Sequence, residues 1–396
     1  MDILILANFC MDFSPSDNGR FKYLAEMLSN ENEVEIVTSS FYHITKKQRD
    51  RIIPKLNFKL TLIDEPGYPK NICIQRFFSH WKWGKNVRKY LETRKKPDVI
   101  YCAVPSLTAA CYAATFCKRN NVRFVIDIQD LWPEAFAMVL KIPVVSDIIF
   151  SPFKKKADYI YKQADAICSV SNTYCERAKR SNPICKNFAA VFLGTDLVQF
   201  DLYAKQNKVA KKPDEFWLGY AGTLGSSYDI KSVIDAVALL KNEGIIITLV
   251  ILGDGPKQNE FLDYANQKGI HYIFYGRVPY VKMCGVLTGC DVVVNPITRG
   301  SAATIINKHA DYAACGKPVI NTQESAEYRK LVTDYHMGFN CENGSSDEMA
   351  QCLKTLFHNK ELREEMGMGA RKCAELLFDR RTSYRNLERV ILSYGE

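Results

Sequence analysis

The sequence predicts an α/β protein made of two similar domains, each built around a parallel sheet. Three observations lead to this prediction. The chain has 396 residues, which is too long for one ordinary hydrophobic core. Apolar strand-like runs alternate with amphipathic helical stretches, and this alternation restarts after a polar, aperiodic stretch at 186–215. Hydrophobic residues make up 47% and charged residues 24%, which are values of a globular protein.

In the first half, short apolar runs are separated by stretches with helical spacing. The first helix is expected over 19–31, where Phe21, Leu24 and Leu28 recur on one face. The runs are too apolar to face water, so we expect a parallel sheet covered on both sides. The predicted strands are 3–8, 33–39, 98–104, 122–128 and 166–171.

The second half repeats this organisation after the predicted linker at 186–215. Strand and helix signals alternate to the end of the chain, where 383–394 forms an amphipathic helix. In such proteins ligands bind at the carboxyl ends of the strands, so we expect a site between the domains. The predicted strands are 217–224, 247–253, 271–276, 291–297 and 318–322, and the helices are 229–242, 256–267, 280–287 and 304–315.

The positive charge lies in the first half of the chain. Residues 1–200 hold 29 Lys and Arg against 20 Asp and Glu, which accounts for the whole net charge of +9, and the rest is neutral. This asymmetry favours an anionic partner for the first half, such as phospholipid, a lipid phosphate or nucleic acid.

The 14 cysteines are scattered singly and none has CxxC spacing. This pattern is typical of buried thiols in a reducing cytosol, without disulfides or a metal site. No stretch is long and apolar enough to be expected to span a bilayer.

Glycine turns follow several predicted strands. The turns at 253–257 and 275–279, together with a third that ends at Asn295 and Pro296, are expected to share one edge of the second sheet. Backbone amides near Gly222 and Thr223 could bind a diphosphate, or the turn could simply allow close helix packing. In the first half, Gly19 could admit a phosphate or sugar, or close an ordinary turn.

The segment TIINKHADYAACGKPVI (304–320) carries charged residues in a helix that is otherwise small and apolar. The helix is expected to end at Gly316, because Pro318 prevents its continuation. Lys308 and Asp311 share a face and could form an ordinary ion pair. Alternatively, the carboxylate accepts hydrogen bonds from ribose hydroxyls, and the amides of 304–306 bind a diphosphate.

This segment resembles the nucleotide-binding helix of family 4 glycosyltransferases, and GDGP (253–256) and GRVP (276–279) lie upstream at that family's spacings. IDIQDLWPEAF (126–136) and 154–171 resemble the bacterial members that build O-antigen and capsule glycans. The resemblance implies the GT-B fold, in which two Rossmann-like domains with parallel sheets face a central cleft. It places the domains at 1–205 and 206–377, with the helix of 378–396 packing back on the first.

The resemblance also assigns roles to individual residues. Asp311 is expected to hold the ribose, and Lys308 matches a lysine of the same motif. Gly222 and Thr223 would face the phosphates, Arg277 and Val278 the nucleobase. Diphosphate and sugar contacts are expected from Gly19, Thr304, Ile305, Ile306 and Arg299.

The chain departs from the family pattern at several positions. Ala303 replaces the usual acidic partner of Asp311, and Gln129 replaces the usual histidine before Asp130. The cations that neutralise the diphosphate are missing around 226–231, so Lys231 or Arg299 could substitute. The resemblance implies a retaining reaction without a metal. The candidate catalytic bases are Asp130 and Asp127, whose alternative roles are helix capping and a structural ion pair.

The stretch 70–96 has nine Lys and Arg against one acid, interleaved with large aromatic residues. Aromatic side chains beside cations suit a lipid headgroup region, although the aromatics could instead face the core. We expect a membrane or acceptor surface here and at 147–156. Its predicted residues are Trp81, Trp83, Lys82, Lys85, Arg88, Lys154 and Lys155.

These observations predict a retaining glycosyltransferase of the hexosyl or N-acetylhexosaminyl type. Its donor is expected to be a nucleotide-sugar, UDP-linked, and its acceptor an undecaprenyl-diphosphate-linked glycan of a capsule or O-antigen. Such an enzyme would be cytoplasmic and peripheral on the inner face of the plasma membrane. The alternatives are a soluble GT-B epimerase of nucleotide-sugars and a basic nucleic-acid binder. The neutral second half and the lack of a nucleic-acid motif argue against the latter.

Overall fold

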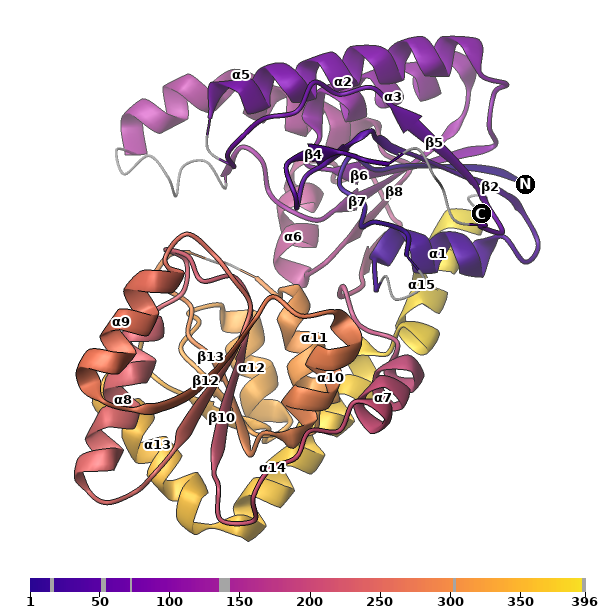
Figure 1. The fold of residues 1–396 in the computed structure, drawn as a ribbon. Coiled ribbons are helices and arrows are strands. Elements are labelled where there is room, and N and C mark those ends of the chain that lie inside the picture. The colour runs from indigo at the N-terminus through magenta and orange to yellow at the C-terminus, as the bar shows by residue number, and fades with distance from the viewer. Residues whose placement is uncertain (15–17, 51–54, 72, 135–142, 302–303, 394–396) are drawn as a thin grey trace. The chain divides into compact units, whose positions relative to one another are not determined.

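The computed structural model divides the chain into two α/β units (Figure 1). It describes residues 1–396 except 15–17, 51–54, 72, 135–142, 302–303, 394–396 and the side chains of 143–149. Unit 1 consists of 1–192 and 384–396, and unit 2 of 193–383. The division lies before helix α7 (Leu197–Gln206), whereas the sequence placed it after this helix.

Unit 1 is built on a seven-stranded sheet in the order β5-β2-β1-β6-β7-β8-β9, and every pair is parallel. The predicted strands of this half are confirmed. The sequence missed the two edge strands, β5 and β9, because their residues are only partly buried and lack a long apolar run. The strands are β1 (Asp2–Leu6), β2 (Glu33–Ser39), β5 (Lys59–Ile63), β6 (Val99–Val104), β7 (Arg123–Ile128), β8 (Ala166–Ser169) and β9 (Phe188–Ala190), with a small hairpin of β3 (Phe41–Tyr42) and β4 (Lys47–Gln48) beside them.

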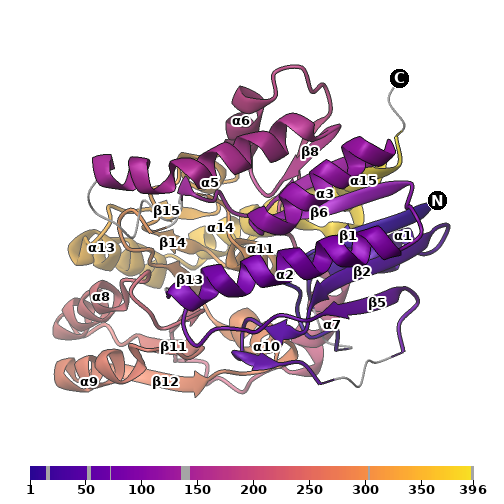
Figure 2. The ribbon, with the colours of Figure 1, turned by 90° about the horizontal axis from the view of Figure 1, so that it is seen from above.

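Helices cover both faces of this sheet (Figures 1 and 2). The last helix contributes to the core of unit 1, because Tyr384, Leu387 and Ile391 are fully buried in the same cluster as Ile5. Figure 2 shows α2, α3 and α5 side by side on one face, and Figure 1 shows α1 and α15 on the other. The helices are α1 (Arg20–Leu28), α2 (Ile74–Thr93), α3 (Leu107–Asn120), α5 (Pro143–Gln163), α6 (Asn172–Ser181) and α15 (Arg380–Leu392).

Unit 2 is built on a six-stranded parallel sheet in the order β12-β11-β10-β13-β14-β15. All five strands predicted for this half are present. The sequence missed only the short, partly exposed edge strand β15. The strands are β10 (Trp217–Ala221), β11 (Thr248–Leu252), β12 (His271–Gly276), β13 (Val292–Asn295), β14 (Val319–Asn321) and β15 (Gly338–Asn340).

The division between the units falls inside the predicted linker at 186–215, but this stretch is not irregular, because it contains β9 and α7. The side chain of Asp196 caps α7 by accepting a hydrogen bond from the Gln199 amide at 3.0 Å, and Leu197 and Phe200 bury one face. The other helices of unit 2 are α8 (Ile230–Asn242), α9 (Gln258–Lys268), α10 (Tyr280–Gly289), α11 (Asn307–Ala314), α12 (Ala326–Asp334), α13 (Ser346–His358) and α14 (Lys360–Cys373), which a π-helical turn (Ala374–Phe378) extends.

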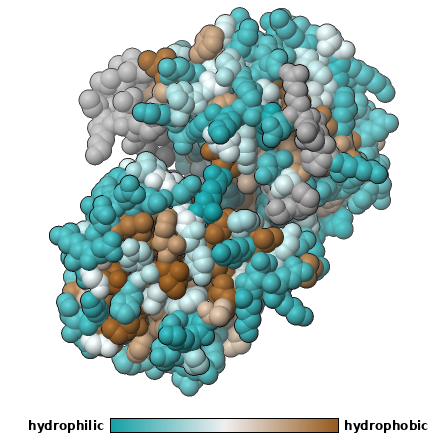
Figure 3. All heavy atoms as spheres, viewed as in Figure 1, coloured by the Kyte–Doolittle hydropathy of each residue, from teal (hydrophilic) through white to brown (hydrophobic). Residues whose placement is uncertain are grey.

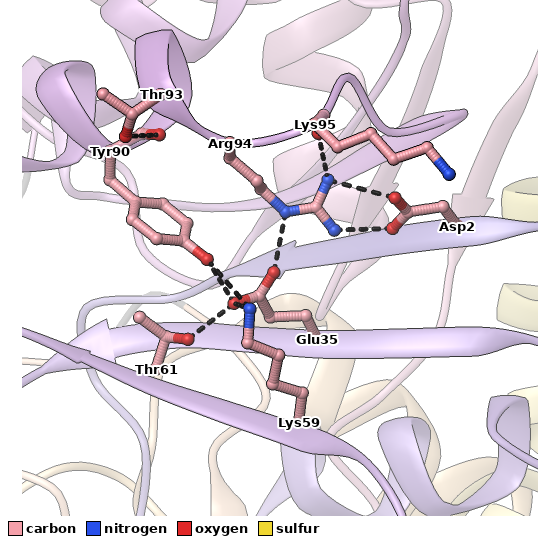
Figure 4. A network of polar contacts seen from close by, with 8 residues as sticks. All are labelled: Asp2, Glu35, Lys59, Thr61, Tyr90, Thr93, Arg94 and Lys95. Atoms are coloured by element: carbon pink, nitrogen blue, oxygen red, sulfur yellow. Dashed lines mark hydrogen bonds and ion pairs between the residues drawn. The ribbon is translucent and has the colours of Figure 1, made fainter.

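A polar network lies toward the amino ends of β1, β2 and β5 in unit 1 (Figure 4). Glu35 accepts hydrogen bonds from Thr61, Tyr90 and Arg94, and Arg94 also pairs with Asp2 at 2.5 Å. Burial alone would raise the pKa of Glu35, but these donors outweigh it and lower the pKa to about 2. The network fastens the end of α2 to the sheet on the edge opposite the carboxyl ends of the strands.

Candidate active site

A cavity of about 430 Å³ lies in unit 2 at the carboxyl ends of β10, β11 and β12, against the first turn of α11. Strand β10 has β11 on one side and β13 on the other, so the strand order reverses here. Such a switch point is the usual ligand site of an open parallel sheet. The lining includes all six residues predicted to bind the nucleotide, namely Gly222, Thr223, Arg277, Val278, Lys308 and Asp311.

Two glycine turns let the backbone form the floor of this cavity. Gly222 and Gly253 follow β10 and β11 and have φ values of 153° and 137°. A Cβ atom on Gly253 would lie 1.9 Å from the carbonyl oxygen of Gly222. Glycine is therefore required for the close approach of the two turns, and backbone rather than side chains faces the cavity there.

The amine of Lys308 is buried beside the loop at Gly222. Its Nζ lies 4.0 Å from the ring centre of Tyr228 and 4.5 Å from that of Tyr220. It has no hydrogen-bond partner within the described part of the chain, and burial lowers its pKa to about 7. The ordinary ion pair with Asp311 does not form, because no described salt bridge of 4.0 Å or less joins the two. An unpaired buried amine costs stability, so its position favours a ligand-binding role.

Asp311 lies about one turn after Lys308 on α11 and lines the same cavity. The hydroxyl of Tyr280 donates a hydrogen bond to its Oδ1 at 2.7 Å, and Thr195 bonds to Tyr280 at 2.7 Å. Burial raises the pKa of Asp311 to about 6, although the Tyr280 bond and the charge of Arg380 partly offset this rise. The carboxylate therefore offers an oriented acceptor to the cavity. The sequence did not indicate Tyr280, since its only signal was its place after the GRVP turn.

The segment before α11 contributes less than predicted. Ile306 lines the cavity, but its N–H is donated to Nδ1 of His309 at 3.2 Å. Thr304 and Ile305 are 5% and 2% exposed and do not line the cavity. Their prediction as direct contacts is not supported, because both residues are buried outside the lining of the cavity. The amide hydrogen bonds predicted from this segment would have to come from the first turn of α11 itself.

The two cations suggested as substitutes for the missing diphosphate partners do not line this cavity. Arg299 pairs with Glu324 at 3.0 Å, and Lys231 pairs with Glu260 at 2.8 Å. Both pairs are exposed, so these side chains form ion pairs on the surface of the protein. The cationic side chains that line the cavity are Lys308 and Arg277.

The structure assigns Asp127 to the core of unit 1, which corrects its prediction as a catalytic base. Asp127 is fully buried, and Arg20 binds both of its oxygens, at 2.8 and 3.1 Å. Gln129 donates a further hydrogen bond to Asp127 at 2.9 Å. A carboxylate satisfied in this way holds α1 against β7, as the alternative of a structural ion pair predicted.

Asp130 faces a second cavity, which lies within unit 1 at the ends of β1, β6 and β7. It accepts a hydrogen bond from Trp132 Nε1 at 3.0 Å, and burial raises its pKa. Gly19 precedes α1 with an ordinary φ of −79°, and part of its loop lies outside the described residues. Ala303 also lies outside the described residues, so its departure from the family pattern has no structural account.

The residues predicted for a membrane or acceptor surface are exposed on α2 and α5, with one exception. Trp81, Lys82, Lys85 and Arg88 are exposed, and Lys85 Nζ lies 4.0 Å from the Trp81 ring centre. Trp83 is fully buried, because the face of α2 that carries it packs against α3.

On α5, Lys154 and Lys155 are exposed, and the ring centre of Phe153 lies 5.8 Å from that of Phe77 on α2. Figure 3 shows apolar side chains among polar ones along the top of unit 1, over α5 and α2. None of the helices in the described part of the chain is long and apolar enough to cross a membrane.

Comparisons with known proteins agree with this geometry. Residues 203–373, which contain the unit 2 cavity, match the family model of the glycosyl transferases group 1. EpsD of Bacillus subtilis, which is named as a glycosyltransferase, is 22% identical over 335 residues, 82% of each chain. WcaI of Escherichia coli, which is named as a colanic acid biosynthesis glycosyl transferase, is 23% identical over 59% of each chain.

Solved structures resemble the chain over its whole length. HepE of Anabaena, solved in complex with UDP, has a TM-score of 0.67 at 16% identity and covers 100% of both chains. Sucrose-phosphate synthase of Thermosynechococcus elongatus has a TM-score of 0.77 at 15% identity and covers 98% of this chain and 97% of its own. Residues 203–373 therefore resemble the group 1 glycosyltransferases, and the chain as a whole has the GT-B fold.

Proposed function

We propose that this glycosyltransferase moves a sugar from a UDP-sugar to an acceptor glycan in the synthesis of a bacterial cell-surface polysaccharide. The observation that carries the proposal is the unit 2 cavity, where the unpaired amine of Lys308 and the oriented carboxylate of Asp311 face one space. The names of the relatives EpsD and WcaI, and the UDP complex of HepE, support the same reaction.

The residues of the cavity suit the leaving group of such a donor. Asp311 would accept hydrogen bonds from the ribose hydroxyls, and Arg277 and Val278 would contact the base. The ammonium of Lys308 and the first-turn amides of α11 would stabilise the charge that develops on the departing diphosphate, without a metal. The reaction would retain the configuration at the anomeric carbon of a hexosyl or N-acetylhexosaminyl group.

The acceptor is proposed to be a glycan linked to a lipid diphosphate, with unit 1 lying against the inner face of the plasma membrane. The exposed Ile74, Phe78 and Trp81, which are 85%, 56% and 40% exposed, stand among lysines on α2. Apolar side chains beside cations favour the surface of an anionic bilayer.

A direct test of the donor is calorimetric titration with UDP, GDP, CDP and ADP. UDP should bind most tightly, and Asp311→Ala should weaken its binding at least tenfold, while the exposed-residue control Lys231→Ala should not. Equal affinity for all four nucleotides, or an Asp311→Ala variant that binds UDP as tightly as wild type, would refute the assignment. The membrane part is tested separately by sedimentation with vesicles containing phosphatidylglycerol, where salt should release the protein.

A further inference from the structure

The second cavity, in unit 1, carries an inference of its own. It measures about 240 Å³ and is lined by residues that follow three neighbouring strands of the sheet. Phe9 comes after β1, Ser106 after β6, and Asp130 after β7. Strand β1 has β2 on one side and β6 on the other, so this cavity too lies at a switch point of its sheet, where ligands bind.

Arg76, in the first turn of α2, forms one wall of this cavity. Its guanidinium lies 4.7 Å from the ring centre of Trp132 and 5.5 Å from that of Tyr68, and it donates one hydrogen bond to the carbonyl of Asn71 at 2.8 Å. The aromatic rings fix the plane of the guanidinium. Its Nε–H is buried without a partner among the described residues, which is costly for a cationic group unless a ligand accepts the bond.

Other polar groups face the same cavity. The hydroxyl of Ser106 is buried without a described partner, and this residue is 2% exposed. Asp130 lies on the same lining with its carboxyl bonded to Trp132. The cavity therefore offers a cationic donor, a hydroxyl and a carboxyl, which together suit a hydroxylated ligand that also bears a negative charge.

Arg76 places a positive charge on one wall of the cavity. Burial, together with the charges of Lys46 and Arg76, lowers the pKa of His43 to about 4. Burial and the charge of Arg76 likewise lower the pKa of His80, to about 3, and no carboxylate offsets either shift. Burial is the larger cause of both shifts, and the charge of Arg76 adds to it. A fixed positive charge on the cavity wall attracts an anion.

We propose that the unit 1 cavity binds an anionic group of the acceptor, a phosphate or a sugar carboxylate, with Arg76 as its main contact. This inference rests on the proposed function, because it defines the chemical class of the acceptor. The anion would bond to the free Nε–H of Arg76, and a neighbouring sugar hydroxyl would reach Ser106 and Asp130.

The test uses the indole N–H signal of Trp132 in NMR spectra of the full chain, assigned with Trp132→Phe. The probes are glucose 1-phosphate, methyl glucuronide and the neutral methyl glucoside. At least one anionic probe should shift the Trp132 signal, and Arg76→Gln should weaken its binding about tenfold or more, as expected for losing a charged hydrogen bond. Lys89→Gln, which removes an exposed charge from the same helix, should bind like wild type. The tighter anion identifies phosphate or carboxylate as the group recognised.

Two results would overturn the inference: neutral glucoside binding as tightly as both anions, or an unchanged anion affinity in folded Arg76→Gln. Arg76→Lys keeps the positive charge but loses the planar guanidinium, so its affinity for the anion should lie between those of wild type and Arg76→Gln. Such a graded loss distinguishes a direct contact from a purely structural effect. UDP titration separates this inference from the proposed function. Wild type that binds UDP but no anion refutes the acceptor assignment alone, whereas wild type that does not bind UDP refutes the donor assignment.

Discussion

Replacing Lys308 with methionine tests whether a positive charge in the unit 2 cavity contributes to UDP binding. The amine of Lys308 lies against the rings of Tyr220 and Tyr228 and has no hydrogen-bond partner among the described residues. Methionine has a similar length and suits this apolar surrounding. The variant should therefore fold, and it should lack only the positive charge beside the loop at Gly222.

The magnitude follows from the environment of the amine. A hydrogen bond between charged groups contributes about 1.5–3 kcal/mol, so UDP should bind roughly 10- to 100-fold more weakly to Lys308→Met. The folded protein also holds the lysine at a pKa of about 7, below its ordinary 10.5. Its charged form is therefore disfavoured on folding, and the methionine variant should be more stable near pH 7, on the order of 1–3 kcal/mol after allowance for solvent screening.

Proton uptake gives a second readout. At pH 8 a lysine with a pKa of about 7 is about nine-tenths neutral, so UDP binding should draw close to one proton into the site. Burial raises the pKa of the neighbouring Tyr220, Tyr228 and Tyr312, so they stay neutral, while Asp311, with a pKa of about 6, is already ionised at pH 8.

Calorimetry in buffers of different ionisation enthalpy measures this uptake directly. Wild type should take up nearly one proton per UDP at pH 8, and Lys308→Met close to none. Lys231→Met is the matched control, since Lys231 pairs with Glu260 outside the cavity and should behave as wild type. Equal UDP affinity and equal proton uptake in wild type and Lys308→Met would refute the reasoning.

Three further predictions concern carboxylates. UDP affinity should fall as the pH drops below about 6, where Asp311 becomes protonated, and this fall should be smaller in Asp311→Asn, as pH-dependent calorimetry would show. Asp127→Asn should lower the free energy of unfolding by about 3–5 kcal/mol in urea, because the buried Arg20 loses its counter-charge; a loss below 1 kcal/mol would contradict a structural role. Glu35, with a pKa of about 2 against an ordinary 4.5, stabilises the fold above pH 4.5 and loses this contribution as the pH falls toward 2. Glu35→Gln should therefore cost about 3 kcal/mol at pH 7, and urea unfolding curves should converge with wild type in acid.

The fold was predictable because its buried central strands appear in the sequence as apolar runs. Strands such as β1 and β10 are buried along nearly their whole length, so their residues leave a strong signal. Edge strands are different: β5 and β9 are partly exposed, and neither forms a long apolar run. Helix α7 was missed for a similar reason, because only Leu197 and Phe200 bury its face within a polar stretch.

Only those residues of the unit 2 cavity that stand in a recognisable sequence motif could be predicted. Lys308 and Asp311 stand in one short segment, so both were found together. The tyrosines that surround them come from distant elements, and Tyr280 and Tyr228 carry no local signal of their role. Asp127 was misassigned because sequence cannot show that Arg20, more than a hundred residues away, neutralises it. Trp83 was misassigned because exposed and core-facing aromatic residues alternate on one helix.

The most direct test of the central claim is sugar transfer itself. Purified protein would be incubated with a panel of nucleotide-sugars and a synthetic prenyl-diphosphate-linked sugar, and the products read by mass spectrometry. The account predicts that a UDP-sugar adds one sugar to the acceptor and releases UDP, and that Lys308→Met and Asp311→Asn lose most of this activity while Lys231→Met keeps it. Transfer from a donor other than UDP-linked ones, or full activity in both cavity variants, would contradict it.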